Sequence, residues 1–278
     1  MSKKFLNIVL HPILNLFVIL FSISCIFPIA WLVYSSLKTQ AEFSVNIISL
    51  PSHPQFGNYL YVIQKYKIMG YFLNSLFSTV LSVALIILLG LVIGYVLARF
   101  SFRGRNFLYV FFISGMLIPV QSFLIPLFIQ FKSLHMLDNR FTLISPYVAF
   151  GLPVAIFLFE SYIKTIPVEM DEAAYIDGCS VGRTMSTVIF PLCRPVLATV
   201  IILSFLASWN EFSFAMVLTK SEALRTLPVG LANFAGVYKV DYTKLMAALV
   251  ISILPVLITY LLFYQKIIEG MTAGAVKG

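Results

Sequence analysis

The sequence predicts an all-α integral membrane protein, and three observations support that prediction. Hydrophobic residues make up 60% of the 278 residues and charged residues only 11%, against about 25% charged in a soluble domain. The apolar residues gather into six runs, each long enough to cross a bilayer about 30 Å thick as a helix. Each run must be helical because hydrocarbon offers its backbone no other hydrogen-bond partner.

The six runs follow one another with polar connections between them. They define a transmembrane domain over residues 13–264, a short N-terminal segment (1–12) and a C-terminal tail (265–278). The first run is too long for the apolar core of a signal peptide, so we expect it to stay as an uncleaved span. The predicted spans are 13–37, 72–98, 107–131, 142–162, 196–218 and 245–264.

The connections and spans carry local signals of their own. The longest connection, 38–71, holds two prolines and a glycine, so we expect turns to order it. The second span carries Gly90, Gly94 and Ala98 at spacings of four, which favours a groove for a neighbouring helix. Proline in a helix removes a backbone donor and kinks it. We therefore expect kinks at Pro119 and Pro126 in the third span and at Pro153 in the fourth.

Polar residues inside spans are costly and usually face the helix bundle or a cavity. Glu160 has Lys164 four residues later, which is typical of an ion pair near the membrane surface. Glu211 has no base at such spacing, so either it bonds to another helix or it lines a translocation path or gate. Asn210 and Gln121 are the other candidates for lining that path.

Several functions are disfavoured. The net charge of +8 lies in short segments between apolar runs, as in membrane proteins, and not in a patch for nucleic acid. Three scattered histidines offer no metal site, and the three cysteines are expected to be free thiols. The sequence has no GxxxxGK[ST] phosphate loop, no HExxH and no nucleotide-binding glycine fingerprint, so we expect no ATP hydrolysis by this chain.

The connection between the fourth and fifth spans, residues 163–195, is rich in acids. Pro167 suits a helix start and is followed by Glu169, Asp171 and Glu172, where the helix dipole favours negative charge. Gly178 suits a helix end. Ser180 suits the start of a second helix that runs to Pro191. We expect helix, glycine turn and helix at the membrane surface.

The small residues of this segment suggest a use for it. Ala174 and Gly178 are four apart and share a face that would let another protein approach closely. The residues alone do not decide between such a docking element and a solvated connector.

The pattern Glu172-Ala173-Ala174-xxx-Gly178 followed by Pro191 resembles the EAA loop of ABC importer permeases, E-A-A-x3-G-x9-I-x-L-P. Val188 and Phe190 stand at its I and L positions. Further stretches are similar to the carbohydrate (maltose-type) branch and its smaller six-span permease. They are Asn58-Tyr59, Asn74-Ser75, Trp209-Asn210-Glu211-Phe212 and the tail 270–278.

The resemblance implies a permease subunit that is not an enzyme and imports a sugar or oligosaccharide. Its first EAA-loop helix would be a cytoplasmic coupling helix, with Glu172, Ala173, Ala174, Gly178 and Pro191 as the coupling residues. The implied partners are a second permease subunit, two ATPase subunits carrying ATP and Mg, and an extracytoplasmic solute-binding protein. The implied location is a bacterial inner membrane.

The resemblance also places both termini in the cytoplasm. Charge counting alone gives nearly equal numbers of basic residues on the two sides, and only the cluster Arg99, Arg103 and Arg105 favours this orientation. The alternative function is a secondary transporter driven by an ion gradient through Glu211 and Glu160. It would require paired intramembrane acids and inverted repeats, and it leaves the acidic segment without a use.

Overall fold

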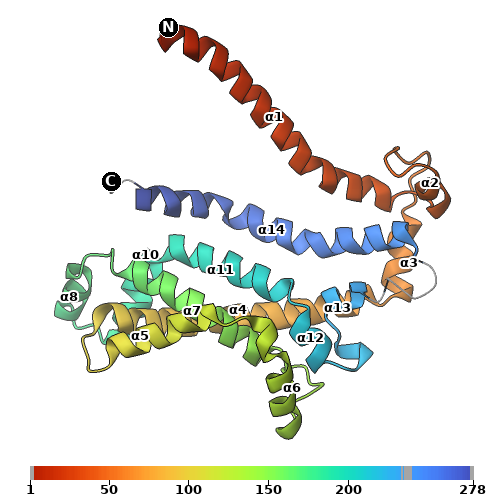
Figure 1. The fold of residues 1–278 in the computed structure, drawn as a ribbon. Helices are drawn as coiled ribbons and strands as arrows, with labels where there is room; N and C mark the ends of the chain where they lie inside the picture. Colours follow the sequence, from red (N-terminus) through yellow and green to blue (C-terminus); the bar gives the residue numbers. More distant parts are fainter. Residues whose placement is uncertain (1–2, 233, 235–239, 276–278) are drawn as a thin grey trace. The chain divides into compact units, whose positions relative to one another are not determined.

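The computed structural model describes the backbone of residues 3–232, 234 and 240–275, and the side chains of residues 11–232, 234 and 240–264. Within these residues every regular element is helical (Figure 1). Four helices are long and apolar enough to cross a membrane, or up to six if each of two bent pairs is one span. The all-α membrane fold is therefore confirmed.

The chain forms two compact units. The first unit comprises residues 1–68 and 231–253, and it contains α1 (Lys3–Ser36), α2 (Gln40–Val45), α3 (Gly57–Lys65) and the start of α14 (Tyr242–Ala275). The second comprises residues 69–230 and 254–278 and contains most of α4 (Ile68–Arg99), the elements that follow it up to residue 230, and the rest of α14.

The first connection is more ordered than the expected turns, because it contains α2 and α3. A capping box starts α2: the Glu42 amide donates to Thr39 Oγ1 at 3.2 Å, and the Thr39 amide donates to the Glu42 carboxylate at 2.9 Å. The buried Lys38 ammonium then donates to the carbonyls of Asn46 and Ile47, at 3.0 Å each. These bonds hold the connection against the end of α1.

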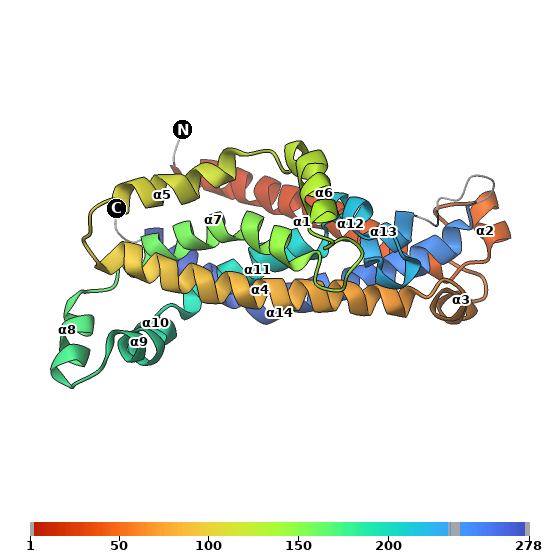
Figure 2. The same ribbon diagram turned by 90° about the horizontal axis from the view of Figure 1, so that it is seen from below.

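In the second unit α4, α7 (Ile144–Ile163) and α11 (Arg194–Trp209) lie side by side (Figures 1 and 2). The predicted glycine groove on α4 receives α7. A Cβ on Gly90 would lie 2.8 Å from Ala155 Cβ, and one on Gly94 would lie 2.7 Å from Phe159 Cβ. Only glycine permits this approach, so the groove prediction is confirmed.

The third predicted span is not one helix. It divides into α5 (Arg105–Ser114), the 3-10 turns Gly115–Leu117 and Val120–Phe123, and α6 (Leu124–Ser133), and its two arms bend by 95°. Ile118, just before Pro119, is extended (φ −87°, ψ 119°), as expected of a residue that precedes proline. Pro119 therefore breaks the run. Pro126 lies in the first turn of α6, where the missing donor costs little.

The fifth predicted span, 196–218, is also interrupted. The helix α11 ends at Trp209, and a short helix α12 (Ser213–Leu218) follows three non-helical residues. At its other end α11 bends by 82° away from residues 181–192.

The fourth and sixth predictions agree better with the structure. Pro153 stays inside α7 without ending it. The sixth run lies within α14, which continues to Ala275, so the predicted tail begins as helix. Residues 276–278 of that tail lie outside the described residues.

Candidate functional site

The acidic segment forms a short surface helix, α8 (Glu169–Ile176). It begins two residues after Pro167, with Glu169, Asp171 and Glu172 in its first turn. Their charges complement the exposed amides of the helix start. In Figure 2, α8 and the α9–α10 region stand beside one end of α4 and α7. The predicted surface helix is therefore present.

A glycine turn ends α8 as predicted. Gly178 has φ +78°, a left-handed conformation. The Cys179 amide donates to the Ala174 carbonyl at 2.9 Å, and the Gly178 amide donates to the Tyr175 carbonyl at 3.0 Å. This pair of bonds is a Schellman motif, which needs a residue with positive φ at the position of Gly178.

The second helix starts at Ser180 and ends near Pro191, also as predicted. It consists of α9 (Val181–Thr184), a π-helical turn (Met185–Ile189) and α10 (Phe190–Leu192). The expected side-chain cap from Ser180 is not formed; its carbonyl instead accepts from the Thr184 amide at 2.8 Å.

Residues 178–182 also have the spacing GxSxG of a hydrolase nucleophile elbow. That elbow requires a strand before the serine, whereas α8 precedes Ser180 here. The structural context of a nucleophile is therefore missing in this part of the chain.

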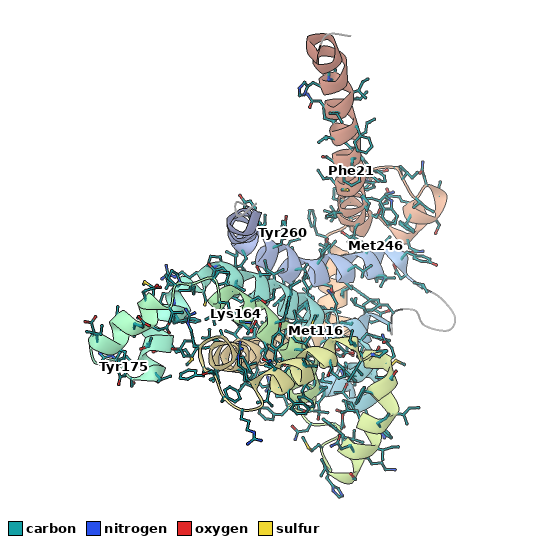
Figure 3. The ribbon with its side chains drawn as sticks, turned by 60° about the vertical axis from the view of Figure 1, so that its left-hand side comes forward. Phe21, Met116, Lys164, Tyr175, Met246 and Tyr260 are labelled. Carbon is teal, nitrogen blue, oxygen red and sulfur yellow. The ribbon has the colours of Figure 1, made fainter. Side chains whose placement is uncertain are left out.

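The docking face expected from Ala174 and Gly178 needs correction. Ala174 is only 6% exposed and is covered by its own chain, while Gly178 lies in the turn beyond the helix. The reason is that α8 contacts α9 and the π-helical turn, which cover one side of it. The exposed face of α8 carries Glu169, Glu172, Ala173 and Ile176, and Tyr175 extends beside it (Figure 3).

The covered side of α8 holds Asp171, which the sequence predicted only as one of the acids at the helix start. Asp171 Oδ1 accepts a hydrogen bond from the Tyr95 hydroxyl at 2.8 Å, and Asp171 Oδ2 lies 2.8 Å from Arg99 Nε. Arg99 also donates through Nη2 to the Ile166 carbonyl at 3.0 Å. The signal in the sequence was the spacing of three between Asp171 and Ala174, which puts both on one face.

A cavity of about 290 Å³ lies farther along the second unit, between α7, α11 and the bend after α5. Its walls are mostly apolar and include Met116, labelled in Figure 3. Its polar groups belong to Tyr147, Ser204, Ser208 and Glu211. Asn210 and Gln121 are exposed and do not line this cavity.

Glu211 organises the break after α11. Its carboxylate accepts from the amides of Phe214 at 2.6 Å and Ala215 at 3.1 Å, and from the Tyr147 hydroxyl at 3.1 Å. It thus satisfies the free amides at the start of α12 and links α12 to α7. The bond to another helix predicted for Glu211 is therefore formed, and Glu211 also lines the cavity. Its place in a translocation path or gate stays a prediction.

Glu160 forms the predicted ion pair with Lys164, and Arg105 Nη2 lies 3.6 Å from the same carboxylate oxygen. The Glu160 side chain is 3% exposed. It therefore pairs with two bases within its own unit and stands apart from Glu211, since it does not line the cavity. The paired acids of a secondary transporter are not brought together here.

Comparison with known proteins agrees with this architecture. The chain is 37% identical over 261 residues to the diacetylchitobiose uptake system permease protein of Streptomyces coelicolor, covering 93% of this chain and 86% of that protein. It is 35% identical to the sulfoquinovosyl glycerol transport system permease protein of Agrobacterium fabrum, covering 91% and 89%.

A solved structure also matches. A chain of a bacterial ABC transporter involved in the import of the acidic polysaccharide alginate superposes with a TM-score of 0.84 at 25% identity, covering 95% of this chain and 98% of that chain. Residues 90–271 match the family described as binding-protein-dependent transport system inner membrane component. This match contains α8, the glycine turn and the cavity residues from Gly115 onward, and the chain belongs to that family of transporter permeases.

Proposed function

We propose that this chain is the permease subunit of an ATP-driven importer of a sugar or oligosaccharide, coupled through α8 to separate ATPase subunits. The observation that carries the coupling role is the exposed face of α8, formed by Glu169, Glu172, Ala173 and Ile176. Ile176 is 83% exposed. The adjacent Tyr175 is 78% exposed, and tyrosine is among the residues enriched at protein contacts.

A hollow of about 470 Å³ adjoins this face. Tyr95 and Phe100 line it from the end of α4, and Glu172, Tyr175 and Ile176 line it from α8. Its mostly apolar wall suits a side chain from a partner, as expected of a contact whose centre is buried. Within the proposal, Glu172, Ala173 and the rim of this hollow contact the ATPase, whereas Ala174, Gly178 and Pro191 shape the loop.

The substrate class follows from the relatives. Their names specify a diacetylchitobiose, a sulfoquinovosyl glycerol and an acidic polysaccharide, all of which contain sugar rings. The cavity near Glu211 combines aromatic and apolar walls with hydroxyl groups, which suits the mixed surface of a sugar. We assign it to this chain's share of the translocation path.

The proposed transporter has further subunits, each a separate chain. A second permease subunit completes the path, two ATPase subunits bind ATP and Mg, and an extracytoplasmic binding protein delivers the solute. ATP-driven closure of the ATPase subunits displaces the coupling helices and switches the spans between inward-open and outward-open states. In this arrangement α8 and both termini face the cytoplasm.

The test is uptake by the complete complex reconstituted in vesicles. We expect a panel of labelled oligosaccharides to include one that enters only when the binding protein is outside and ATP is inside. Glu172→Lys should reverse the charge of the exposed face and reduce co-purification of the ATPase subunits. Uptake without ATP, or full ATPase binding by this variant, would contradict the proposal.

The secondary-transport alternative is separable in the same vesicles. A carrier that moves protons or sodium through Glu211 would stop when the ion gradient is dissipated, with ATP still present. We expect uptake to continue, because the Glu211 carboxylate is already bonded to Tyr147, Phe214 and Ala215.

A further inference from the structure

The two sides of α8 differ in what their acids contact. Glu169 and Glu172 are exposed, whereas Asp171 is directed at α4. The side chain of Asp171 is 16% exposed and that of Arg99 is 7% exposed. From this difference we infer that Asp171, Arg99 and Tyr95 form a clamp that transmits displacement of α8 to α4. The inference rests on the proposed coupling function of α8.

The clamp holds Asp171 at two points. Tyr95 and Arg99 lie one turn apart on α4, so both reach the same carboxylate, one at each oxygen. An arginine that joins an ion pair with a carboxylate and a hydrogen bond to a carbonyl links two segments at one point. Arg99 does this by pairing with Asp171 through Nε and with the Ile166 carbonyl through Nη2. Arg99 therefore also holds the segment that follows α7, at Ile166, next to Asp171.

The clamp acts on a helix that can carry a displacement. Arg99 is the last residue of α4, a helix of 32 residues. Gly94, the residue before Tyr95, and Gly90, about one turn earlier, bring α4 into direct contact with α7. Close-packed helices transmit a shift instead of absorbing it. A movement of α8 thus reaches α4 through the clamp and reaches α7 through the glycine contact.

Tyr95, Arg99 and Asp171 line the hollow beside the docking face, but none of the three side chains is more than 16% exposed, so the clamp differs from the exposed face of α8. The exposed residues of α8 decide whether an ATPase subunit binds, whereas Asp171 has both oxygens engaged within its own chain. Loss of the clamp should therefore leave docking intact and weaken the link between ATP hydrolysis and transport. Asp171, Arg99 and Tyr95 are in this sense positioning residues.

The first test is Asp171→Asn, compared with Asp177→Asn in the reconstituted complex. Both substitutions remove one charge from the same loop, but Asp177 is exposed at the end of α8. We expect Asp171→Asn to lower uptake about tenfold, within the usual range of coupling between sites. ATPase subunits should still co-purify and hydrolyse ATP within about twofold of the parent rate. Asp177→Asn should behave like the parent.

Two further variants cover the case in which Asp171→Asn reduces folding. Tyr95→Phe keeps the ring and removes only the hydroxyl that donates to Asp171, and we expect a smaller loss of uptake in a stable complex. Exchange of the charges, Asp171→Arg with Arg99→Asp, should recover part of the uptake that Asp171→Arg alone loses. If Asp171 and Arg99 only filled space, the double substitution would recover no uptake.

The outcomes separate this inference from the proposed function. Normal uptake by both Asp171→Asn and Tyr95→Phe would overturn the clamp and leave the coupling proposal standing. If Asp171→Asn instead loses the ATPase subunits while Asp177→Asn keeps them, Asp171 belongs to docking and the clamp is overturned. If the parent chain itself binds no ATPase subunit, the coupling proposal fails.

Discussion

Gly178 adopts φ +78° in the Schellman turn that ends α8. A Cβ at this position would meet nothing within 4 Å. The need for glycine therefore comes from backbone strain, since side chains other than glycine lose about 1–2 kcal/mol in the left-handed region. The EAA-type pattern preserves a turn here, and the turn sets where α8 stops and α9 starts.

Gly182 provides a matched control for this residue. It also has open space at its Cβ, but it lies in α9 without positive φ. We expect Gly178→Ala to speed hydrogen exchange of the Cys179 amide by about 5–30-fold, the equivalent of about 1–2 kcal/mol. Gly182→Ala should leave it unchanged or slower because alanine favours helix. Gly178→Asn should recover part of the protection, since asparagine tolerates this conformation. Equal exchange in both alanine variants would contradict a conformational role.

At the scale of elements, α2 shows how a short helix is held outside the spans. The Thr39 amide and then Ser52 donate hydrogen bonds to the Glu42 carboxylate, and they lower its pKa from 4.5 to about 2. A lowered pKa means that the folded state favours the ionised carboxyl. Its stabilising contribution is complete above pH 4.5 and is lost as pH falls through about 2.

This pH dependence can be read from Trp31, whose indole donates to the Ile47 carbonyl in the same connection. In a Trp209→Phe background we expect acid titration to change Trp31 fluorescence with a midpoint well below pH 4.5. In Glu42→Gln the transition should be absent, because no carboxyl remains to be protonated. A midpoint at the ordinary value of 4.5 would show that the capping bonds do not form.

The contact of α4 with α7 gives a second prediction at this scale. A Cβ on Gly94 would lie 2.7 Å from Phe159 Cβ and 3.1 Å from the Glu160 amide nitrogen, so the helices would have to separate. Overpacking of this kind costs about 1–3 kcal/mol. We expect Gly94→Ala to lower the melting temperature of the purified complex by about 2–4 °C for each kcal/mol of this overpacking cost. Gly70→Ala on the same helix meets no atom within 4 Å and is the control.

The spacing of small residues was enough to predict this contact, because the groove depends only on residues of α4. The breaks in the third and fifth runs were harder to predict. Pro119 was expected to kink its helix, but the 95° bend also requires α6 to find a place of its own. The end of α11 at Trp209 depends on Glu211, which satisfies the amides of α12 with help from Tyr147 of α7.

At the scale of the whole molecule, the compact unit that contains α1 leaves most of that helix's apolar surface uncovered. The span His11–Ser36 has none of its most apolar window buried. Lipid can cover such a helix, and so can the second permease subunit of the proposed complex. We expect the second subunit to contact it, because the contacts of α1 within its own unit lie near its end, as between Trp31 and Phe43, and packing against a neighbouring helix would hold the rest.

If this expectation holds, the chain is more stable in the presence of the second permease subunit. Expressed without a second permease subunit, it should be degraded faster in membranes than when the two are co-expressed, as followed by the decay of a pulse-labelled chain. A variant with Ile19→Lys on α1, where the side chain is 55% exposed, should lose this protection. Val45→Lys, exposed outside the span, should keep it. Equal lifetimes with and without the second subunit would contradict the prediction.

The sequence by itself determined the membrane class, the apolar runs, the surface helix of the acidic segment and the glycine at its turn. These features depend on composition, on spacing along one helix and on local backbone conformation. Only the tertiary structure decided that Ala174 is covered, that Asp171 meets Arg99 and Tyr95, and that Glu211 closes a helix break beside a cavity. The physical reason is that the direction of a polar side chain is set by partners on distant elements, which hydrophobic periodicity does not encode.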